Sequence, residues 1–363
     1  MIEHLYIHIP FCPNICPYCA FYKETAGRDR VELFIEALLL EAQFHASELL
    51  PRTIFFGGGT PSALSFSQME RLLDGLHHTL NLSAIEEWTI EMNPATVSSD
   101  KAKLLYEAGV NRISMGVQSW DDAVLKTLGR MHSSQKGEES FYLLREAGFR
   151  NISIDLIFGI PHQSLNSWRN TLEKTVLLSP EHLSAYGLTY EEGTDFFRQR
   201  SRGVMKENND LEAEQFELAD AILESSGYEH YEISNYAKNH HESKHNLAYW
   251  LGSDYLGLGP SSFSTVRGER WRNIAETGLY SSSTIEGKTA RDFEEKLSLS
   301  LLASERAAFG LRTNQGLDFE KAHPWHQAMV EMEQHGLLYR TQDRWLLTKK
   351  GFLLADTVGE IFF

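Results

Sequence analysis

Short apolar runs alternate with longer amphipathic segments through the first half of the chain. Each run has the length of a strand, and each segment that follows repeats its apolar positions with the period of a helix. The expected strands are HLYIHI (4–9), TIFF (53–56), EWTIEM (87–92), RISMGV (112–117), NISIDLIF (151–158) and HLSAYGL (182–188). Repeated strand–helix units predict an α/β fold with a parallel sheet, which right-handed crossovers curl into a barrel or part of one.

The pattern changes in the second half of the chain. A His-rich polar loop, AKNHHESKHN, precedes a glycine-rich stretch, and helical periodicity returns from about residue 290. The chain ends in an expected hairpin, GLLYR and RWLLT around TQD, followed by a helix. We therefore expect a core over residues 1–235, a connecting region over 236–285 and a smaller, mainly helical, winged-helix-like domain over 286–363.

Composition narrows the classes of function. The chain has 363 residues, and its 34 Lys and Arg against 50 Asp and Glu give a net charge of -16. Phosphate binding needs a basic field, so this balance argues against nucleic acid as the main partner. The N-terminus lacks the basic and apolar regions of a signal peptide, and no stretch approaches the ~20 apolar residues of a membrane helix. We expect a cytoplasmic protein.

All the cysteines lie within eight residues, in the motif Cys12-x-x-x-Cys16-x-x-Cys19 directly after the first expected strand. An odd number of cysteines in a reducing compartment does not indicate a disulfide framework. Thiolates so close together can converge on an iron–sulfur cubane and leave one iron open to bind a ligand. Structural zinc, with His8 or another histidine as the fourth ligand, and buried inert cysteines are the alternatives that spacing alone leaves open.

Several motifs taken together resemble a known family. The cysteine motif after the first strand of a strand–helix repeat is similar to the radical S-adenosylmethionine superfamily. Further motifs extend the match: FGGGTPS (56–62), EMNP (91–94), GVQS (116–119), Arg130 and DLIFGIP (155–161). They resemble the anaerobic coproporphyrinogen oxidase branch, which implies a partial (β/α)6 radical SAM barrel with a [4Fe–4S] cluster on Cys12, Cys16 and Cys19.

The resemblance also implies which residues bind S-adenosylmethionine. The methionine amino group would lie near Glu91, the carboxylate near Arg130, and the ribose hydroxyls near Gln118 and Asp155. The complete implied set is Tyr6, Gly58, Gly59, Thr60, Glu91, Gln118, Arg130 and Asp155. From the residues alone, Asp155 stands out because a charge inside the apolar run ISIDLIF needs a partner, whereas core packing explains Tyr6 at least as well.

Three features place the chain within this branch. The porphyrinogen-oxidising enzymes have a fourth cysteine where this chain has Phe21, and they have an N-terminal extension before the first strand. HNLAYW (245–250) instead matches H-N-x-x-Y-W, the signature of the HemW-type heme chaperones. This resemblance implies that His245 binds heme, since imidazole is a common axial ligand of heme iron. His240 and His241 are alternatives, and so is a packed element that His245 caps.

The function implied by this resemblance is that of a heme chaperone, which takes up heme and delivers it to an apo-hemoprotein acceptor. A membrane-protein acceptor and a homodimer are further partners that the resemblance admits. The alternative is an oxygen-independent coproporphyrinogen III oxidase of porphyrin biosynthesis, in which a 5′-deoxyadenosyl radical drives oxidative decarboxylation. A third hypothesis is a zinc protein without radical chemistry.

Overall fold

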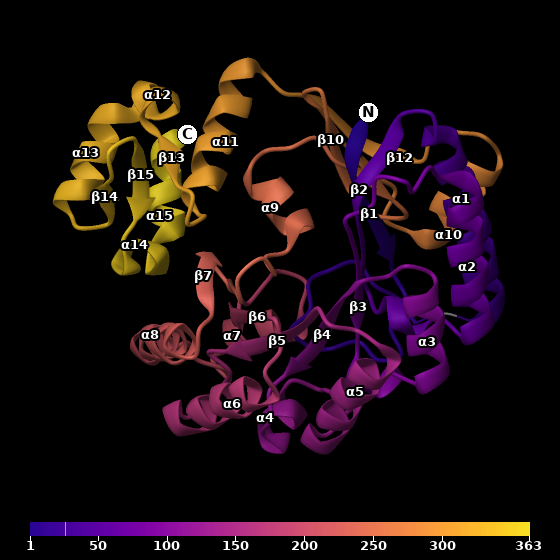
Figure 1. Ribbon diagram of the computed structural model, residues 1–363, viewed down its shortest axis with the longest axis horizontal. Coiled ribbons are helices and arrows are strands. Elements are labelled where there is room, and N and C mark those ends of the chain that lie inside the picture. The colour runs from indigo at the N-terminus through magenta and orange to yellow at the C-terminus, as the bar shows by residue number, and fades with distance from the viewer. Residues whose placement is uncertain (26) are drawn as a thin grey trace.

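Parallel strands in chain order form the centre of the molecule (Figure 1), which a computed structural model describes over residues 1–25 and 27–363. Within this part of the chain, six strands lie side by side as β1 (Ile2–Ile9), β2 (Leu49–Gly58), β3 (Glu87–Met92), β4 (Arg112–Gln118), β5 (Ile152–Phe158) and β6 (His182–Gly187). β9 (Leu256–Leu258) extends the sheet parallel to β1. The hairpin of β7 (Glu229–Glu232) and β8 (Asn235–Ala237) extends it beyond β6. The expected α/β fold is confirmed.

Helices connect the strands and cover the outer face of the sheet (Figure 1). They are α1 (Arg28–His45), α2 (Phe66–Thr79), α3 (Ser99–Glu107), α4 (Asp122–Thr127), α5 (Ser134–Ala147), α6 (Leu165–Leu178), α7 (Asp195–Ser201) and α8 (Asn209–Ser225), with 3-10 turns η1 (Pro61–Ala63) and η2 (Pro94–Thr96). Side chains satisfy the free N–H groups at several helix starts. Ser65 and Gln68 form a capping box on α2, and Ser98 and Ser164 cap α3 and α6.

The strands present apolar side chains to the helices and polar side chains to the barrel interior. On β1, Leu5, Ile7 and Ile9 are fully buried in the apolar core, whereas His4 and Tyr6 alternate with them on the opposite face. The same alternation places further polar residues inward: Thr53, Glu87, Glu91, Ser114, Asp155, His182 and Ser184. Parallel strands covered on both faces usually consist of continuous apolar runs. A polar interior therefore marks a space that holds more than core side chains.

The segment after β8 returns to the core. α9 (Lys244–Trp250) lies at the amino ends of β2 and β3, where its residues bond to Thr53 and Glu87. A small antiparallel sheet follows, formed by β10 (Phe263–Val266), β11 (Glu269–Asn273) and β12 (Arg291–Lys296). α10 (Thr277–Ile285) packs against α1.

The C-terminal part has its own apolar core, built around Trp345. Its elements are α11 (Leu299–Leu311), β13 (Leu317–Asp318), α12 (Phe319–Ala322), η3 (His323–Trp325), α13 (His326–Gln334), β14 (Leu338–Arg340), β15 (Arg344–Leu347), α14 (Lys349–Leu353), α15 (Ala355–Gly359) and η4 (Glu360–Phe362). The hairpin of β14 and β15 with α14 behind it matches the expected hairpin and helix. It lies beside α8 in Figure 1, and Lys349 bonds Asp220 and Glu224 of that helix.

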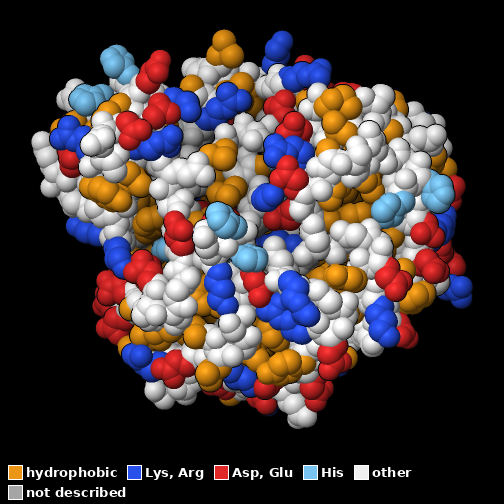
Figure 2. Space-filling view, in the orientation of Figure 1, with side chains coloured by type: hydrophobic (Ala, Val, Ile, Leu, Met, Phe, Trp, Pro, Cys, Tyr) orange, Lys and Arg blue, Asp and Glu red, His pale blue; other side chains and the backbone are white. Residues whose placement is uncertain are grey.

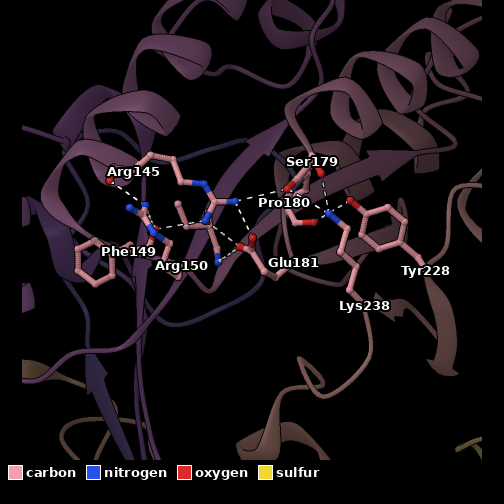
Figure 3. Close-up of polar contacts among 9 residues, drawn as sticks. Arg145, Phe149, Arg150, Ser179, Pro180, Glu181, Tyr228 and Lys238 are labelled. Atoms are coloured by element: carbon pink, nitrogen blue, oxygen red, sulfur yellow. Dashed lines mark hydrogen bonds and ion pairs between the residues drawn. The ribbon is translucent and has the colours of Figure 1, made fainter.

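A cluster of hydrogen bonds and an ion pair connects the segments at the amino ends of β5 and β6 (Figure 3). Arg145 of α5 pairs with Glu181 at 2.8 Å, and Glu181 also accepts the N–H of Ile152 at 3.0 Å. Lys238 donates to the hydroxyl of Ser179 at 2.7 Å and lies over the ring of Tyr228. These contacts hold the end of the barrel that lies opposite the carboxyl ends of the strands.

The surface carries charges of both signs. In the face drawn in Figure 2, acidic and basic side chains are interspersed rather than segregated. Over residues 1–25 and 27–363, no helix combines the length and apolar character required to cross a membrane.

Candidate functional site

The cysteine loop follows β1 and lies against the turn after β2. The N–H of Cys12 donates to the carbonyl of Glu24 at 2.9 Å, which closes the loop. Sγ of Cys12 lies 3.4 Å from the hydroxyl of Thr60, and Sγ of Cys16 lies 3.6 Å from Nη1 of Arg130. The loop is therefore in contact with two residues of the implied S-adenosylmethionine set.

Partial burial changes the acidity of the thiols. Cys12, Cys16 and Cys19 are all half-buried. Burial raises the pKa of the Cys12 and Cys19 thiols above their usual value, and neighbouring thiols raise it further. Cluster iron binds thiolates, so loading this loop would release protons. In the described part of the chain, no group of three His, Cys, Asp or Glu side chains has the arrangement that holds a metal ion.

The glycine turn after β2 fits against the end of β1. Gly58 has a φ of +106°, and a Cβ atom there would lie 2.6 Å from the ring of His8. A Cβ atom on Gly59 would lie 2.6 Å from the backbone of Pro10. The N–H of Thr60 donates to the carbonyl of Phe11 at 2.9 Å. These glycines are thus required for packing of the turn as well as for close approach of a ligand.

Glu91 faces the interior at the end of β3, close to Tyr6. A Cβ atom on Gly57 would lie about 3.1 Å from the ring of Tyr6 and 3.2 Å from Oε1 of Glu91, so the missing side chain makes room for both. Burial, reinforced by the charge of Asp155, raises the pKa of Glu91 to about 8. The carboxyl group is therefore neutral at pH 7 until a cation comes beside it.

Arg130 and Gln118 meet at a bulge in β4. The register between β4 and β5 shifts between Gly116 and Gln118, and Gln118 has a φ of 70°. Nη2 of Arg130 donates to the carbonyl of Gly116 at 2.6 Å. Its Nε atom is buried and has no hydrogen-bond partner among the described residues. A guanidinium whose buried Nε–H has no partner is suited to an anionic ligand.

Serine hydroxyls hold the carboxylate of Asp155. Ser153 and Ser184 donate to Oδ1 at 2.9 and 2.8 Å, and Ser114 donates to Oδ2 at 2.7 Å. The partners that a charge in this strand requires come from β4, β5 and β6. They fix the carboxylate on the inner face, where Asp155 remains partly accessible.

The bonds of Asp155 continue through the barrel to the start of α9. Ser153 lies 2.8 Å from Nδ1 of His182, Nε2 of His182 lies 2.8 Å from the hydroxyl of Tyr231, and the N–H of Ser243 donates to that hydroxyl at 3.2 Å. Burial, reinforced by Arg112, holds the pKa of His182 well below its usual value. A neutral His182 with its proton on Nδ1 satisfies every contact in this chain of bonds.

His245 lies inside the barrel and uses both ring nitrogens. Nδ1 is 2.8 Å from the hydroxyl of Thr53, and Nε2 is 2.9 Å from the hydroxyl of Tyr249. Burial lowers the pKa of His245 to about 3. Ser243, and not His245, caps α9, and Glu87 accepts the N–H of His245 at 3.1 Å. In this conformation the ring of His245 is a packed, bonded group with no nitrogen free for iron.

A cavity of about 650 Å³ opens beside the cysteine loop. Its walls come from β1, from the residues that follow Cys19, from α9 and from α11. Aromatic and aliphatic side chains dominate the lining, among them Phe21, Tyr249, Tyr255, Leu302 and Phe309. Its volume lies in the range of cofactor and small-molecule sites.

Several residues of the site escape the sequence motifs. Tyr186 follows Ser184 by two residues on β6, so it lies on the same inner face. Nε2 of His8 donates to the carbonyl of Tyr22 at 2.9 Å, and Nδ1 accepts from the hydroxyl of Tyr6 at 3.0 Å. Tyr255 lines the cavity. The period-2 alternation of polar residues on the strands is the signal that identifies Tyr186 and His8.

The sequence is similar to a known superfamily and to several heme chaperones. The model of the radical SAM superfamily matches residues 6–175. The heme chaperone HemW of Lactococcus lactis is 37% identical, over 98% of this chain and 96% of its own length. HemW of Bacillus subtilis is 35% identical over 99% of both chains, and HemW of Escherichia coli is 35% identical over 99% of this chain and 97% of its own.

A solved structure shares the fold. Coproporphyrinogen III oxidase (HemN) from Escherichia coli, a radical SAM enzyme, superimposes with a TM-score of 0.86. The match covers 99% of this chain and 90% of that chain at 24% sequence identity. The chain therefore shares the fold of that protein over nearly its whole length.

Proposed function

The chain belongs to the HemW family of the radical SAM superfamily, and on that premise we propose that it is a heme chaperone that delivers heme to an apoprotein acceptor. Membership in the superfamily implies a [4Fe–4S] cluster and S-adenosylmethionine as cofactors. One observation carries the proposal: an aromatic cavity of about 650 Å³ lies directly beside the cysteine loop and is walled by α9, which carries the HNLAYW motif. Planar, mostly apolar tetrapyrroles suit such a space.

The cofactor site is assigned to the residues whose chemistry fits it. Cys12, Cys16 and Cys19 would hold the cluster, which with S-adenosylmethionine supplies one-electron chemistry when bound. Arg130, whose buried Nε lacks a partner, would bind the ligand carboxylate, and Glu91 would bind the ammonium.

The remaining members of the set would complete the same S-adenosylmethionine site. Asp155 and Gln118 would accept from the ribose hydroxyls, and the Gly58–Thr60 turn would approach the methionine end. Tyr6 would close the interior beside Glu91. The ordered serine contacts of Asp155 support this assignment, because they hold the carboxylate in one orientation.

The proposal is tested with protein whose cluster has been reconstituted under anaerobic conditions. Heme-loaded protein is mixed with an apo-hemoprotein, and acceptor heme content is measured after separation. We expect transfer from the heme-loaded protein, at a rate that differs from that of free heme. No heme uptake, or no transfer, would contradict the proposal.

A second assay tests the alternative hypothesis of a coproporphyrinogen III oxidase, because the chain shares its fold with HemN. The reduced protein is supplied with S-adenosylmethionine and coproporphyrinogen III, and products are followed by chromatography. We expect no protoporphyrinogen, and its formation would favour the oxidase. Three further points stay predictions: that the heme acceptor can be a membrane protein, that the chain forms a homodimer, and that it is located in the cytoplasm.

A further inference from the structure

The cavity beside the cysteine loop is lined by both aromatic and charged side chains. Phe21, Phe263 and Phe309 are among the aromatic ones, and Arg270, Glu305 and Arg306 are the charged ones. Arg270 is bound in a two-point contact with Glu305, at 2.8 and 2.7 Å. This combination of side chains suits a flat ligand with an apolar ring and carboxylates at its edge.

Most of the lining side chains able to ligate heme iron are already bonded. His8 uses one ring nitrogen for Tyr6 and the other for the carbonyl of Tyr22. The hydroxyl of Tyr22 accepts the N–H of Thr277 at 3.1 Å. The side chains of His8 and Tyr6 bond each other, and Tyr22 is bonded separately through its hydroxyl, so freeing any of these hydroxyls or nitrogens for iron leaves a polar partner unsatisfied.

The motif residues are bonded in the same way. Tyr249 lies 2.9 Å from Nε2 of His245, which is itself fully buried. Tyr255, five residues after Trp250, differs: its hydroxyl forms no hydrogen bond within residues 1–25 and 27–363. Among the His and Tyr side chains that line the cavity, Tyr255 is therefore the one whose donor atom is available.

We propose that Tyr255 is the iron ligand of ferric heme in this cavity, and that Arg306 binds a heme propionate. The inference rests on the proposed heme chaperone function and assigns its binding site. Tyrosine is an established heme ligand type, and a phenolate oxygen is a hard donor suited to ferric iron. The phenolic O–H bond breaks as the O–Fe bond forms, the proton leaves to water, and the iron keeps its oxidation state.

The backbone holds Tyr255 in a fixed position for this role. Its N–H and carbonyl pair with Thr265 at 2.9 and 3.0 Å, and Thr265 pairs across the strands with Arg270. Tyr255, Thr265 and Arg270 thus form a row across neighbouring strands that lines the cavity. The ring of Tyr255 also packs edge-on against Tyr249, with centroids 4.6 Å apart. The HNLAYW helix would then support the ligand rather than supply it.

The charges at the cavity favour an anionic ligand set. The guanidinium of Arg270 donates to the hydroxyl of Thr265, the residue that pairs with Tyr255, at 3.1 Å. Arg306 forms no ion pair with any described residue. Its stem packs over Gly252, where a Cβ atom would lie 2.5 Å from Cγ of Arg306. Arg306 is therefore the cation that the cavity can offer to a propionate.

The iron ligand is tested by spectroscopy of the full chain titrated with ferric heme. We expect wild type and Tyr249→Phe to show the phenolate-to-iron charge-transfer band and an Fe–O stretch in resonance Raman spectra. Tyr255→Phe should lose both, and Tyr255→His should replace them with an imidazole-ligated spectrum. Cluster content and circular dichroism serve as controls for folding.

The outcomes separate this inference from the proposed function. Stoichiometric heme binding with a phenolate signature that persists in Tyr255→Phe would overturn the assignment of Tyr255 and leave the chaperone proposal intact. Heme binding by wild type with an imidazole spectrum that His245→Ala removes would also overturn it. Failure of wild type to bind heme would contradict the proposed function itself.

The propionate contact is tested by comparing heme with its dimethyl ester. We expect wild type to bind heme about tenfold or more tightly than the ester, since contacts to charged groups are the strong ones. This preference should disappear in Arg306→Ala and persist in Arg169→Ala, a matched change at an exposed arginine of α6. An undiminished preference in Arg306→Ala would overturn the assignment of Arg306.

Discussion

At the scale of single residues, Arg130 connects the cysteine loop to the ligand pocket. Its guanidinium bonds Cys16 and the carbonyl of Gly116, and its Nε is buried without a partner in the described chain. We predict that Arg130→Ala weakens S-adenosylmethionine binding by about 1.5–3 kcal/mol, roughly 10- to 150-fold, because a charged contact is lost. Calorimetry on reconstituted protein measures this change.

Arg130→Lys is the matched variant for this prediction. Lysine keeps the charge and lacks the planar fork, so we expect an affinity between those of wild type and Arg130→Ala. Cluster content should stay equal in all three proteins. Unchanged affinity in Arg130→Ala at full cluster content would show that the arginine does not bind the ligand.

The raised pKa of Glu91 should make the free energy of unfolding depend on pH, and it fixes the sign of this dependence. Burial raises this pKa from 4.5 to about 8, so the folded protein without ligand favours the protonated form. Its contribution to the free energy of unfolding therefore falls as pH rises from about 4.5 to about 8. Glu91→Gln should remove this loss, which urea titrations at both ends of the range measure. An equal loss in wild type and variant would contradict the prediction.

The same group should release a proton when S-adenosylmethionine binds at pH 7. An ammonium beside Glu91 favours the carboxylate and lowers its pKa again. Calorimetry in buffers of different ionisation enthalpy measures the released protons, and Glu91→Gln should release fewer. Identical proton release in the two proteins would exclude Glu91 as the group that meets the ammonium.

Residue motifs allowed part of the site to be predicted because their chemistry is local in sequence. The cysteine motif and the glycine turn after β2 are contiguous, and the structure brings Cys12 to Thr60. The serine partners of Asp155 and the position of Tyr255 could not be predicted. Ser114 and Ser184 come from neighbouring strands, and their pairing depends on sheet register rather than on sequence spacing.

At the scale of elements, α9 is bound to the amino ends of the strands by buried polar contacts. Tyr231 is central, because its hydroxyl bonds both His182 and the N–H of Ser243 at the start of α9. Tyr231→Phe leaves both partners buried and unpaired, so we predict a loss of about 1–3 kcal/mol in the free energy of unfolding. Urea denaturation monitored by circular dichroism measures it.

Tyr339→Phe is the control for this variant, because Tyr339 is 45% exposed. Its change in stability should stay within about 0.5 kcal/mol. Equal stability of Tyr231→Phe and wild type would mean that the chain of bonds from Asp155 to α9 adds nothing to the fold.

The sequence predicted whether a segment forms a helix or a strand better than it predicted where that segment begins and ends. The strand expected at 53–56 begins at Leu49 in the structure, because the chain after α1 turns directly into β2. HNLAYW forms a helix that points His245 into the barrel interior, and its motif alone did not reveal that His245 would bond Thr53. That contact spans 192 positions in sequence.

At the scale of the whole molecule, Lys349 links the C-terminal part to the barrel. Its Nζ lies 2.6 Å from Asp220 and 2.7 Å from Glu224 of α8. Because Lys349 is largely exposed, we predict that Lys349→Met costs at most about 1 kcal/mol of global stability. Amide exchange in β14 and β15 should nevertheless become faster, while β1 to β6 stay unchanged.

Lys350→Met, at the next position of α14, is the control and should leave amide exchange unaltered. Mass spectrometry of exchanged peptides measures both variants. Equal exchange in Lys349→Met and wild type would mean that the apolar contacts between the parts suffice. The hairpin of the C-terminal part was predictable from its turn, but this link joins positions 129 apart and required the structure.

The central claim is that heme occupies the cavity beside the cysteine loop. Ser253 lines this cavity, and Ser253→Trp would fill it, whereas Ser282→Trp adds the same side chain at an exposed position of α10. The most direct measurement is heme affinity of these two variants at equal cluster content. The account predicts that Ser253→Trp loses heme binding by at least about tenfold, while Ser282→Trp binds like wild type. Wild-type affinity in Ser253→Trp would place heme elsewhere.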